Sequence, residues 1–125
     1  MTAVLDAGAL IAIDRRDRRV GALLRVLQRA GVPVCTSAGV VAQVWRRGRT
    51  QANLARLLSG VDVAAIDDVA GRRIGELLGA SGTADLVDAH VALLGGPGDR
   101  ILTSDPGDIG ALLQARRVEA LVVQV

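Results

Sequence analysis

The sequence predicts an α/β fold in which helices cover both faces of a parallel sheet. Short apolar segments rich in β-branched residues alternate with segments that repeat apolar residues at the helical period. This alternation is typical of parallel sheets with helical crossovers. The strand segments are almost continuously apolar, as expected of strands that are buried on both faces. The chain has 125 residues, the length of one domain, so we expect residues 1–125 to form a single domain.

Each expected element is identified by its own pattern. The strand segments are "AVLD" at 3–6, "VPVCT" at 32–36, "VDVAAI" at 61–66, "ILTS" at 101–104 and "ALVVQV" at 120–125. The helix-period segments are 20–31, 38–48, 68–80 and 83–95. A further helix is indicated after Asp105, because Pro106 is favoured at a first helical position. The sequence therefore predicts a five-stranded sheet.

Composition limits the classes of function that the chain can have. Half of the residues are hydrophobic and Trp45 is the only aromatic, so the core must consist of Val, Leu, Ile and Ala. All basic residues are arginines, and the formal net charge of +2 is too small to indicate nucleic-acid binding by itself. No apolar run approaches the roughly 18 residues of a membrane span and no signal-peptide pattern is present, so we expect a cytoplasmic protein without a membrane partner.

The single cysteine has no expected chemical role. Cys35 has no second cysteine to pair with, which excludes an internal disulfide and a cysteine-based zinc site. Its place in "VPVCTS" favours a small buried hydrophobic side chain.

Several aspartates are predicted to meet at one edge of the sheet. Asp6 follows the first strand and Asp105 follows the fourth, so both lie at the carboxyl edge, where open α/β sheets bind ligands. A helix that leads into a parallel strand begins at the same edge, which places Asp85 and Asp88 of "TADLVDAH" near it. Their spacing of three residues turns both carboxylates to one helix face.

Each aspartate also has a local explanation as a helix cap. Asp6 can cap the helix after it, and Asp105 before Pro106 is a strong N-cap signal, with Asp108 in the position of a capping-box partner. Thr83 can cap the helix that carries the other two acids. Together, however, these carboxylates repel one another by several kcal/mol at an effective dielectric constant near 20, and a cation would relieve that repulsion. Oxygen ligands suit Mg²⁺ or Mn²⁺, so we interpret Asp6 as a metal ligand.

The motifs that carry these acids resemble a known family. The segments are "VLDAGALIAI", "TSAGVVAQVWR", "TADLVDAHVA" and "ILTSDPGDI", in this order over essentially the whole chain. They look like the PIN domain, most closely the VapC-type toxin ribonucleases of type II toxin–antitoxin pairs. The resemblance implies a three-layer α/β/α sandwich around a mostly parallel five-stranded sheet. It also implies Mg²⁺- or Mn²⁺-dependent endoribonuclease activity on an RNA substrate, a homodimer and a small VapB-like antitoxin.

The resemblance assigns the site residue by residue. Asp6, Asp88 and Asp105 match the catalytic, metal-binding acids of the family pattern. Asp85 and Asp108 match accessory acids, and we expect Asp85 to contribute to the metal site.

One position departs from the family pattern. Where the family usually has a glutamate in the helix after the second strand, this chain has Gln43. The amide carbonyl can still contact a cation or its waters, but it brings no negative charge, so metal affinity should fall. Either Asp85 supplies the missing charge, or the chain is a weakened or inactive PIN-like module that binds RNA or protein.

The remaining residues favour hydrolysis by a metal-activated water. The chain has no lysine or tyrosine and only one histidine, so a side-chain base or a covalent nucleophile is not expected. Thr103 or Ser104 can bond a phosphate oxygen, although a role at the strand end is favoured for both. His90 lies about 200° around the helix from Asp88 and is expected to pack in the core or at an interface. Trp45 is expected to pack in the core or between subunits.

Two arginine clusters border the acidic motifs. Arg15 lies in "DRRDRRV", and Arg46 and Arg47 lie in "WRRGR". They either contact the phosphates of RNA, with affinity that falls as salt is added, or form solvated helix ends.

Two other classes of protein fit less well. A magnesium-dependent phosphohydrolase with an aspartate nucleophile usually has "DxD" and a downstream lysine, whereas this chain has "DAG" and no lysine. A receiver-type signalling domain has edge aspartates too, but again needs a lysine.

Overall fold

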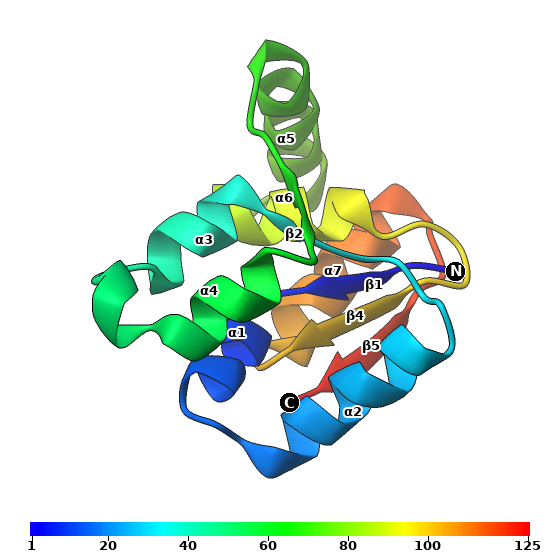
Figure 1. Cartoon of the computed structure of the whole chain (residues 1–125). Coiled ribbons are helices and arrows are strands. Elements are labelled where there is room, and N and C mark those ends of the chain that lie inside the picture. The colour runs from blue at the N-terminus through cyan, green and yellow to red at the C-terminus, as the bar shows by residue number, and fades with distance from the viewer.

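The computed structural model describes residues 1–125 and contains one five-stranded sheet. The strand order is β3-β2-β1-β4-β5, and every neighbouring pair is parallel (Figure 1). The strands are β1 (Ala3–Leu5), β2 (Val34–Ser37), β3 (Asp62–Ala64), β4 (Arg100–Thr103) and β5 (Leu121–Gln124). The predicted α/β fold with a five-stranded parallel sheet is confirmed.

Helices cover both faces of this sheet. They are α1 (Ala7–Asp14), α2 (Arg18–Arg29), α3 (Ala38–Val44), α4 (Ala52–Leu58), α5 (Asp68–Ser81), α6 (Leu86–Leu94) and α7 (Pro106–Arg116), with a 3₁₀ turn at Gly48–Thr50. Right-handed crossovers place the helices between β1, β2 and β3 on one face and those between β3, β4 and β5 on the other. Figure 1 shows α2 and α4 in front of the sheet, α6 and α7 behind it, and α5 extending away. The molecule is therefore a three-layer α/β/α sandwich.

The core is built from aliphatic side chains of the central strands and the helices. All three residues of β1 are fully buried, and so are Ile101 and Leu102 of β4. The two edge strands are partly exposed, so the continuous apolar pattern means burial on both faces only at the centre of the sheet. Trp45 keeps 38% of its surface exposed, which excludes the core as its expected place and leaves packing between subunits as a prediction. Cys35 is half-buried against the core, and burial raises the pKa of its thiol to about 11.

Three features of the helices differ from the sequence prediction. Helix α3 ends at Val44 instead of Gly48, because the backbone of Trp45 is extended. Helix α4 was not predicted, because its short segment "ANLARLL" has neither a capping residue nor a long apolar repeat. Helix α6 begins at Leu86, and its cap is Asp85 instead of Thr83. The Asp85 carboxylate accepts hydrogen bonds of 3.0 Å from the amides of Val87 and Asp88. The Thr83 hydroxyl instead bonds the hydroxyl of Ser81 at 2.7 Å.

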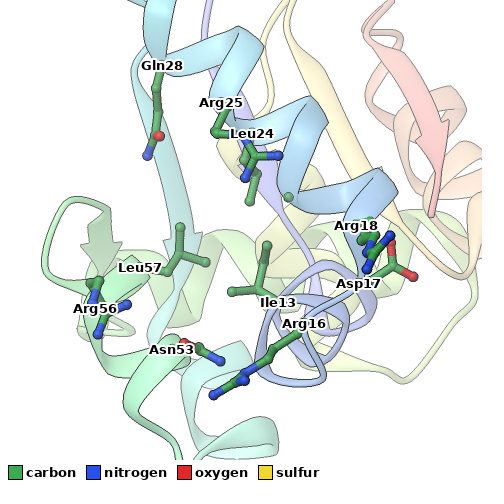
Figure 2. Close-up of a pocket in the computed structure, with 11 residues that line it drawn as sticks. Ile13, Arg16, Asp17, Arg18, Leu24, Arg25, Gln28, Asn53, Arg56 and Leu57 are labelled. Carbon is green, nitrogen blue, oxygen red and sulfur yellow. The ribbon is translucent and has the colours of Figure 1, made fainter.

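Two further features complete the architecture. None of the helices has both the length and the apolarity that crossing a membrane alone would require, and α5 and α6 meet that test only as a pair bent by 104°. On the front face, the end of α1 together with α2 and α4 encloses a cleft whose side chains are drawn in Figure 2.

Candidate active site

Asp6 is held in a fixed orientation where β1 meets α1. Its side chain is only 3% exposed, and its backbone amide continues the sheet by donating to the carbonyl of Leu102 at 2.9 Å. One carboxylate oxygen accepts from the amide of Ala7 at 2.8 Å, and the other accepts from the Thr103 hydroxyl at 2.6 Å. Asp6 therefore caps α1 and is also tied to the end of β4. Each carboxylate oxygen keeps a free lone pair for a further ligand.

Thr103 links Asp6 to the second predicted acid. Its hydroxyl oxygen accepts a 2.9 Å hydrogen bond from the amide of Asp105 while it donates to Asp6. Asp105 occupies the N-cap position of α7, but its side chain makes no capping bond, so the predicted cap is wrong in this respect. The reason is the backbone geometry, because Asp105 has ψ at 62° instead of the extended value of a cap. The exposed Asp105 carboxylate is free to bind something else.

A glycine at the start of α1 brings these two loops together. A Cβ atom on Gly8 would lie 2.6 Å from the Ser104 hydroxyl oxygen and 3.0 Å from its backbone nitrogen. No side chain fits there, so α1 packs directly against the segment that carries Ser104 and Asp105. Ser104 is exposed beside this contact.

Three more acids line a hollow next to this edge. Asp85, Asp88 and Asp108 surround a space of about 190 Å³ between the start of α6 and the start of α7. Asp85 is occupied as the cap of α6, whereas the carboxylate of Asp88 accepts no hydrogen bond from the protein. Asp108 lies in the first turn of α7 and is exposed.

The electrostatics show that these acids act on one another. The pKa of Asp88 rises from 3.8 to about 6, mainly because burial removes water from its carboxylate. The other causes of this pKa shift are the nearby charges of Asp85, Asp6, Asp105 and Asp108, in that order. The other four predicted acids therefore all lie near enough to Asp88 for their charges to act on it.

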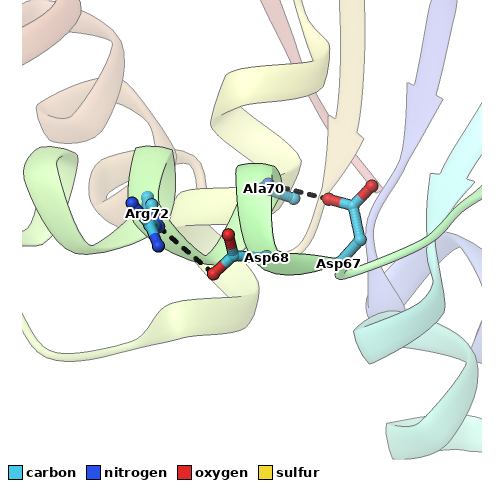
Figure 3. A network of polar contacts seen from close by, with 4 residues as sticks. All are labelled: Asp67, Asp68, Ala70 and Arg72. Carbon is cyan, nitrogen blue, oxygen red and sulfur yellow. Dashed lines mark hydrogen bonds and ion pairs between the residues drawn. The ribbon is translucent and has the colours of Figure 1, made fainter.

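No arginine neutralises this cluster. The single ion pair of the chain joins Arg72 to Asp68 at 3.2 Å on the exposed surface of α5, beside Asp67, which caps that helix through the amide of Ala70 (Figure 3). This pair contributes little, because both side chains are exposed. The acids at the carboxyl edge are thus repelling one another without a cationic partner from the protein.

The donor chemistry of this edge fits a hard divalent cation. Every group is a carboxylate oxygen, which suits Mg²⁺ or Mn²⁺. No three acidic, histidine or cysteine side chains already converge on one point in a geometry that would hold a metal. The side chains of Asp88 and Asp105 make no hydrogen bond, so the protein fixes neither carboxylate in the way that Thr103 and Ala7 fix Asp6.

The accessory residues from the sequence lie in different environments. Gln43 is exposed on α3 and its amide makes no hydrogen bond. Arg15 and Ser104 line a second hollow, of about 370 Å³. The guanidinium of Arg46 donates to the carbonyls of Ala42 at 3.0 Å and Trp45 at 2.7 Å, so this arginine is partly used in the fold. Arg47 is exposed.

Gln51 is a structural residue that the sequence analysis missed. It is only 7% exposed, and its carbonyl oxygen accepts from the amides of Arg46 and Arg47 at 2.8 and 3.0 Å. Its amide nitrogen donates to Asp14 at 3.1 Å and to the carbonyl of Val44 at 2.9 Å. No local pattern distinguishes it from an exposed glutamine, because its four partners, from the end of α1, the end of α3 and the loop after α3, meet only in the folded chain.

His90 lies away from the acids, as predicted. It is 3% exposed, and its Nδ1 shares a 2.5 Å hydrogen bond with the hydroxyl of Ser37, which ties α6 to the end of β2. Burial lowers its pKa, and the positive charge of Arg73 lowers it further. The prediction of a packing role is confirmed.

This sheet order, with carboxylates gathered at the carboxyl edge, defines a three-layer α/β/α domain with an acidic edge. A chain in the crystal structure of VapBC2 from Rickettsia felis, bound to a DNA fragment from their promoter, is similar to this one with a TM-score of 0.69. The similarity covers 100% of this chain and 99% of the other, at 15% sequence identity, and it confirms the predicted fold. No protein-family model matches the sequence, and neither does any curated protein.

Proposed function

We propose that the chain is a metal-dependent endoribonuclease that acts as the toxin of a VapBC-like toxin–antitoxin pair. The observation that carries this proposal is the set of mutually repelling carboxylates around Asp88, which has no cation of its own in the protein. The fold shared with a chain of VapBC2 supports the same proposal. In this interpretation the carboxylates are kept unpaired so that a divalent ion can bind them.

The proposed roles follow from the position of each side chain. Asp6, Asp88 and Asp105 would hold Mg²⁺ or Mn²⁺, and Asp85 and Asp108 would add negative charge beside them. When bound, such an ion lowers the pKa of a water molecule and neutralises charge on the scissile phosphate. The chain's own residues orient Asp6 through Thr103 and offer the exposed Ser104 hydroxyl to a phosphate oxygen. His90 takes no part, because it is bonded to Ser37 inside the fold.

Cleavage of RNA in the presence of Mn²⁺ tests the proposal. The variants Asp6→Asn, Asp88→Asn and Asp105→Asn each keep the side-chain shape but remove a charge, so cleavage should fall at least about a hundredfold. The matched control is Asp62→Asn, since Asp62 is exposed at the opposite, amino-terminal end of β3. Chelation by EDTA should abolish cleavage. Equal cleavage by the wild type and Asp6→Asn would contradict the proposal.

The proposed partners are a small VapB-like antitoxin and a second copy of the chain. For the antitoxin, the support is the solved VapBC2 assembly with promoter DNA. For the homodimer, the support is the family resemblance of the sequence motifs. Light scattering after gel filtration should give about twice the chain mass of 12.9 kDa, and a mass of one chain would contradict the homodimer.

A second candidate function is a PIN-like binding module without catalysis. It is favoured by Gln43, whose exposed and unbonded amide supplies no charge at the position where the family pattern has an acid. We expect Gln43→Glu to tighten Mn²⁺ binding in calorimetry, because it adds a carboxylate near an acidic site. The control is Gln114→Glu, on the exposed part of α7. Unchanged affinity in Gln43→Glu would show that position 43 does not face the metal.

A further inference from the structure

A basic cleft lies on the front face of the sheet, outside the acidic edge. It has a volume of about 460 Å³, within the usual range for ligand sites. Four arginines line it: Arg16, Arg18, Arg25 and Arg56. Figure 2 shows that they come from the turn after α1, from α2 and from α4, beside Ile13 of α1 and Leu57 of α4. Segments far apart in the sequence thus place guanidinium groups around one hollow.

The charges of these arginines are not compensated inside the cleft. None of the four makes an ion pair or a side-chain hydrogen bond, since the only ion pair of the chain is on α5. The one acid in the lining is Asp17, and its carboxylate is occupied as the N-cap of α2, where it accepts from the amide of Val20 at 2.9 Å. The cleft therefore carries a net positive charge.

Packing does not explain why arginines stand here. Elsewhere in the chain arginines stabilise the fold, as Arg19 does by donating to the carbonyl of Gln124 at 3.1 Å and Arg116 by donating to that of Gly95 at 2.7 Å. In the cleft, Arg25 folds back over Gly21 without a partner. The left-handed backbone of Arg16, with φ of 59°, ends α1, because the amides of Arg16 and Asp17 donate to the carbonyls of Ile13 and Ala12. That cap explains the backbone of Arg16, but it gives no partner to the guanidinium groups of the cleft, and their lack of a partner points to a binding role.

A path connects this cleft with the acidic edge. The hollow that contains Ser104, Gly8 and Arg15 shares Asp17 with the cleft, so the two hollows adjoin. They follow α1, whose eight residues span roughly 12 Å. A strand of a few nucleotides can bridge that distance while one of its phosphates lies at Asp6 and Asp105.

We propose that the four-arginine cleft binds the phosphates of single-stranded RNA on one side of the cleavage site. This inference rests on the proposed ribonuclease function. Guanidinium groups bind phosphate oxygens in pairs of parallel hydrogen bonds. Such bonds suit contacts with the phosphate backbone of RNA that do not depend on the base sequence. RNA is favoured over an acidic protein segment because the row of hollows leads to the carboxylates proposed to cleave it. The cleft fixes which way the strand crosses those carboxylates.

Binding of a short fluorescein-labelled single-stranded RNA, measured by anisotropy in EDTA at several salt concentrations, tests the inference. The double variant Arg25→Gln/Arg56→Gln should weaken binding on the order of tenfold. It should also reduce the slope of log K against log salt by about 1.4, because each lost phosphate contact accounts for about 0.7. The control Arg29→Gln removes the same charge from α2 outside the cleft and should leave that slope nearly unchanged. Circular dichroism confirms that each variant is folded.

The outcomes separate this inference from the proposed function. An unchanged salt slope in the double variant, or no RNA binding by the wild type, overturns the cleft as an RNA site. Weaker binding of polyglutamate together with unchanged RNA binding assigns the cleft to an acidic protein instead. Binding is measured in EDTA and cleavage separately in Mn²⁺, so RNA binding that depends on the cleft in a chain that cleaves no RNA with Mn²⁺ supports the inference while contradicting the ribonuclease proposal.

Discussion

Thr103 connects two acids of the candidate site through a single hydroxyl group. We expect Thr103→Val to destabilise the fold by about 1–3 kcal/mol, because the buried carboxylate of Asp6 loses a donor and the amide of Asp105 loses an acceptor. The variant should also weaken Mn²⁺ binding, since Asp6 is no longer held in one orientation. Urea denaturation and calorimetry measure the two effects.

Thr36 provides a matched control for this prediction. It is equally buried, and its hydroxyl donates to the backbone carbonyl of Leu5 at 2.6 Å instead of to an acid. Thr36→Val should therefore cost comparable stability without changing Mn²⁺ affinity. If both variants lower the affinity for Mn²⁺ equally, the role assigned to Thr103 is wrong. Thr103→Ser should restore both properties, because it keeps the hydroxyl.

At the scale of residues, the sequence was informative where function follows from position on a strand. Asp6 and Asp105 were predictable because each directly follows an apolar strand segment. The bonds they make were less predictable, because the free carboxylate of Asp105 depends on the backbone angles at the start of α7 and not on the residue type. Gln51 was not predictable, because its partners meet only in the folded chain.

At the scale of elements, the close packing of α1 against the β4–α7 segment depends on Gly8. Gly8→Ala would place a methyl group 2.6 Å from the Ser104 hydroxyl oxygen, so α1 or the loop must shift. We expect a loss of about 1–3 kcal/mol in the free energy of unfolding, measured with urea, as for overpacking in a core. RNA cleavage should fall too, because the shift separates Asp6 from Asp105.

The control for Gly8 lies in a helix where space is open. Gly75 of α5 has no neighbouring atom within 4 Å of an added Cβ. Gly75→Ala should therefore stabilise the protein by about 0.5–1 kcal/mol through the better helix propensity of alanine. A stabilising Gly8→Ala would contradict the packing argument.

The burial of each element explains whether the sequence predicts it. Strands were found because burial on both faces leaves short continuous apolar segments at the centre of the sheet, as in β1 and β4. Helix α4 was missed because only Leu54 of its seven residues is fully buried, which leaves no apolar repeat long enough to detect. Helix starts depend on which polar side chain reaches the free amides, so Asp85 displaced the predicted Thr83.

At the scale of the whole molecule, charge is segregated in a way that the net value hides. The formal charge of +2 gave no indication of nucleic-acid binding. The fold nevertheless gathers acids at the carboxyl edge and four unpaired arginines in one cleft on the front face. Such separation arises from topology, because the cleft draws on α1, α2 and α4. Composition cannot show it.

The acidic edge should make stability depend on both pH and divalent metal. The pKa of Asp88 is raised from 3.8 to about 6, so the native state binds this proton more tightly than the unfolded chain does. The protonated Asp88 side chain contributes to the free energy of unfolding below pH 3.8, and this contribution is lost as the pH rises through 6. Asp88→Asn should therefore raise the melting temperature at neutral pH and have little effect below pH 3.8. Differential scanning fluorimetry at the two pH values measures this difference.

Metal addition distinguishes a binding site from simple repulsion. At neutral pH, Mn²⁺ should raise the melting temperature of the wild type, because an ion that binds only the native state stabilises it. The rise should be smaller in Asp88→Asn, which lacks one of the proposed ligands. Asp62→Asn reports the effect of losing a carboxylate elsewhere, and it should respond to Mn²⁺ as the wild type does. An equal rise in all three proteins would mean that the ion binds outside the carboxyl edge, and the repulsion around Asp88 would then need another explanation.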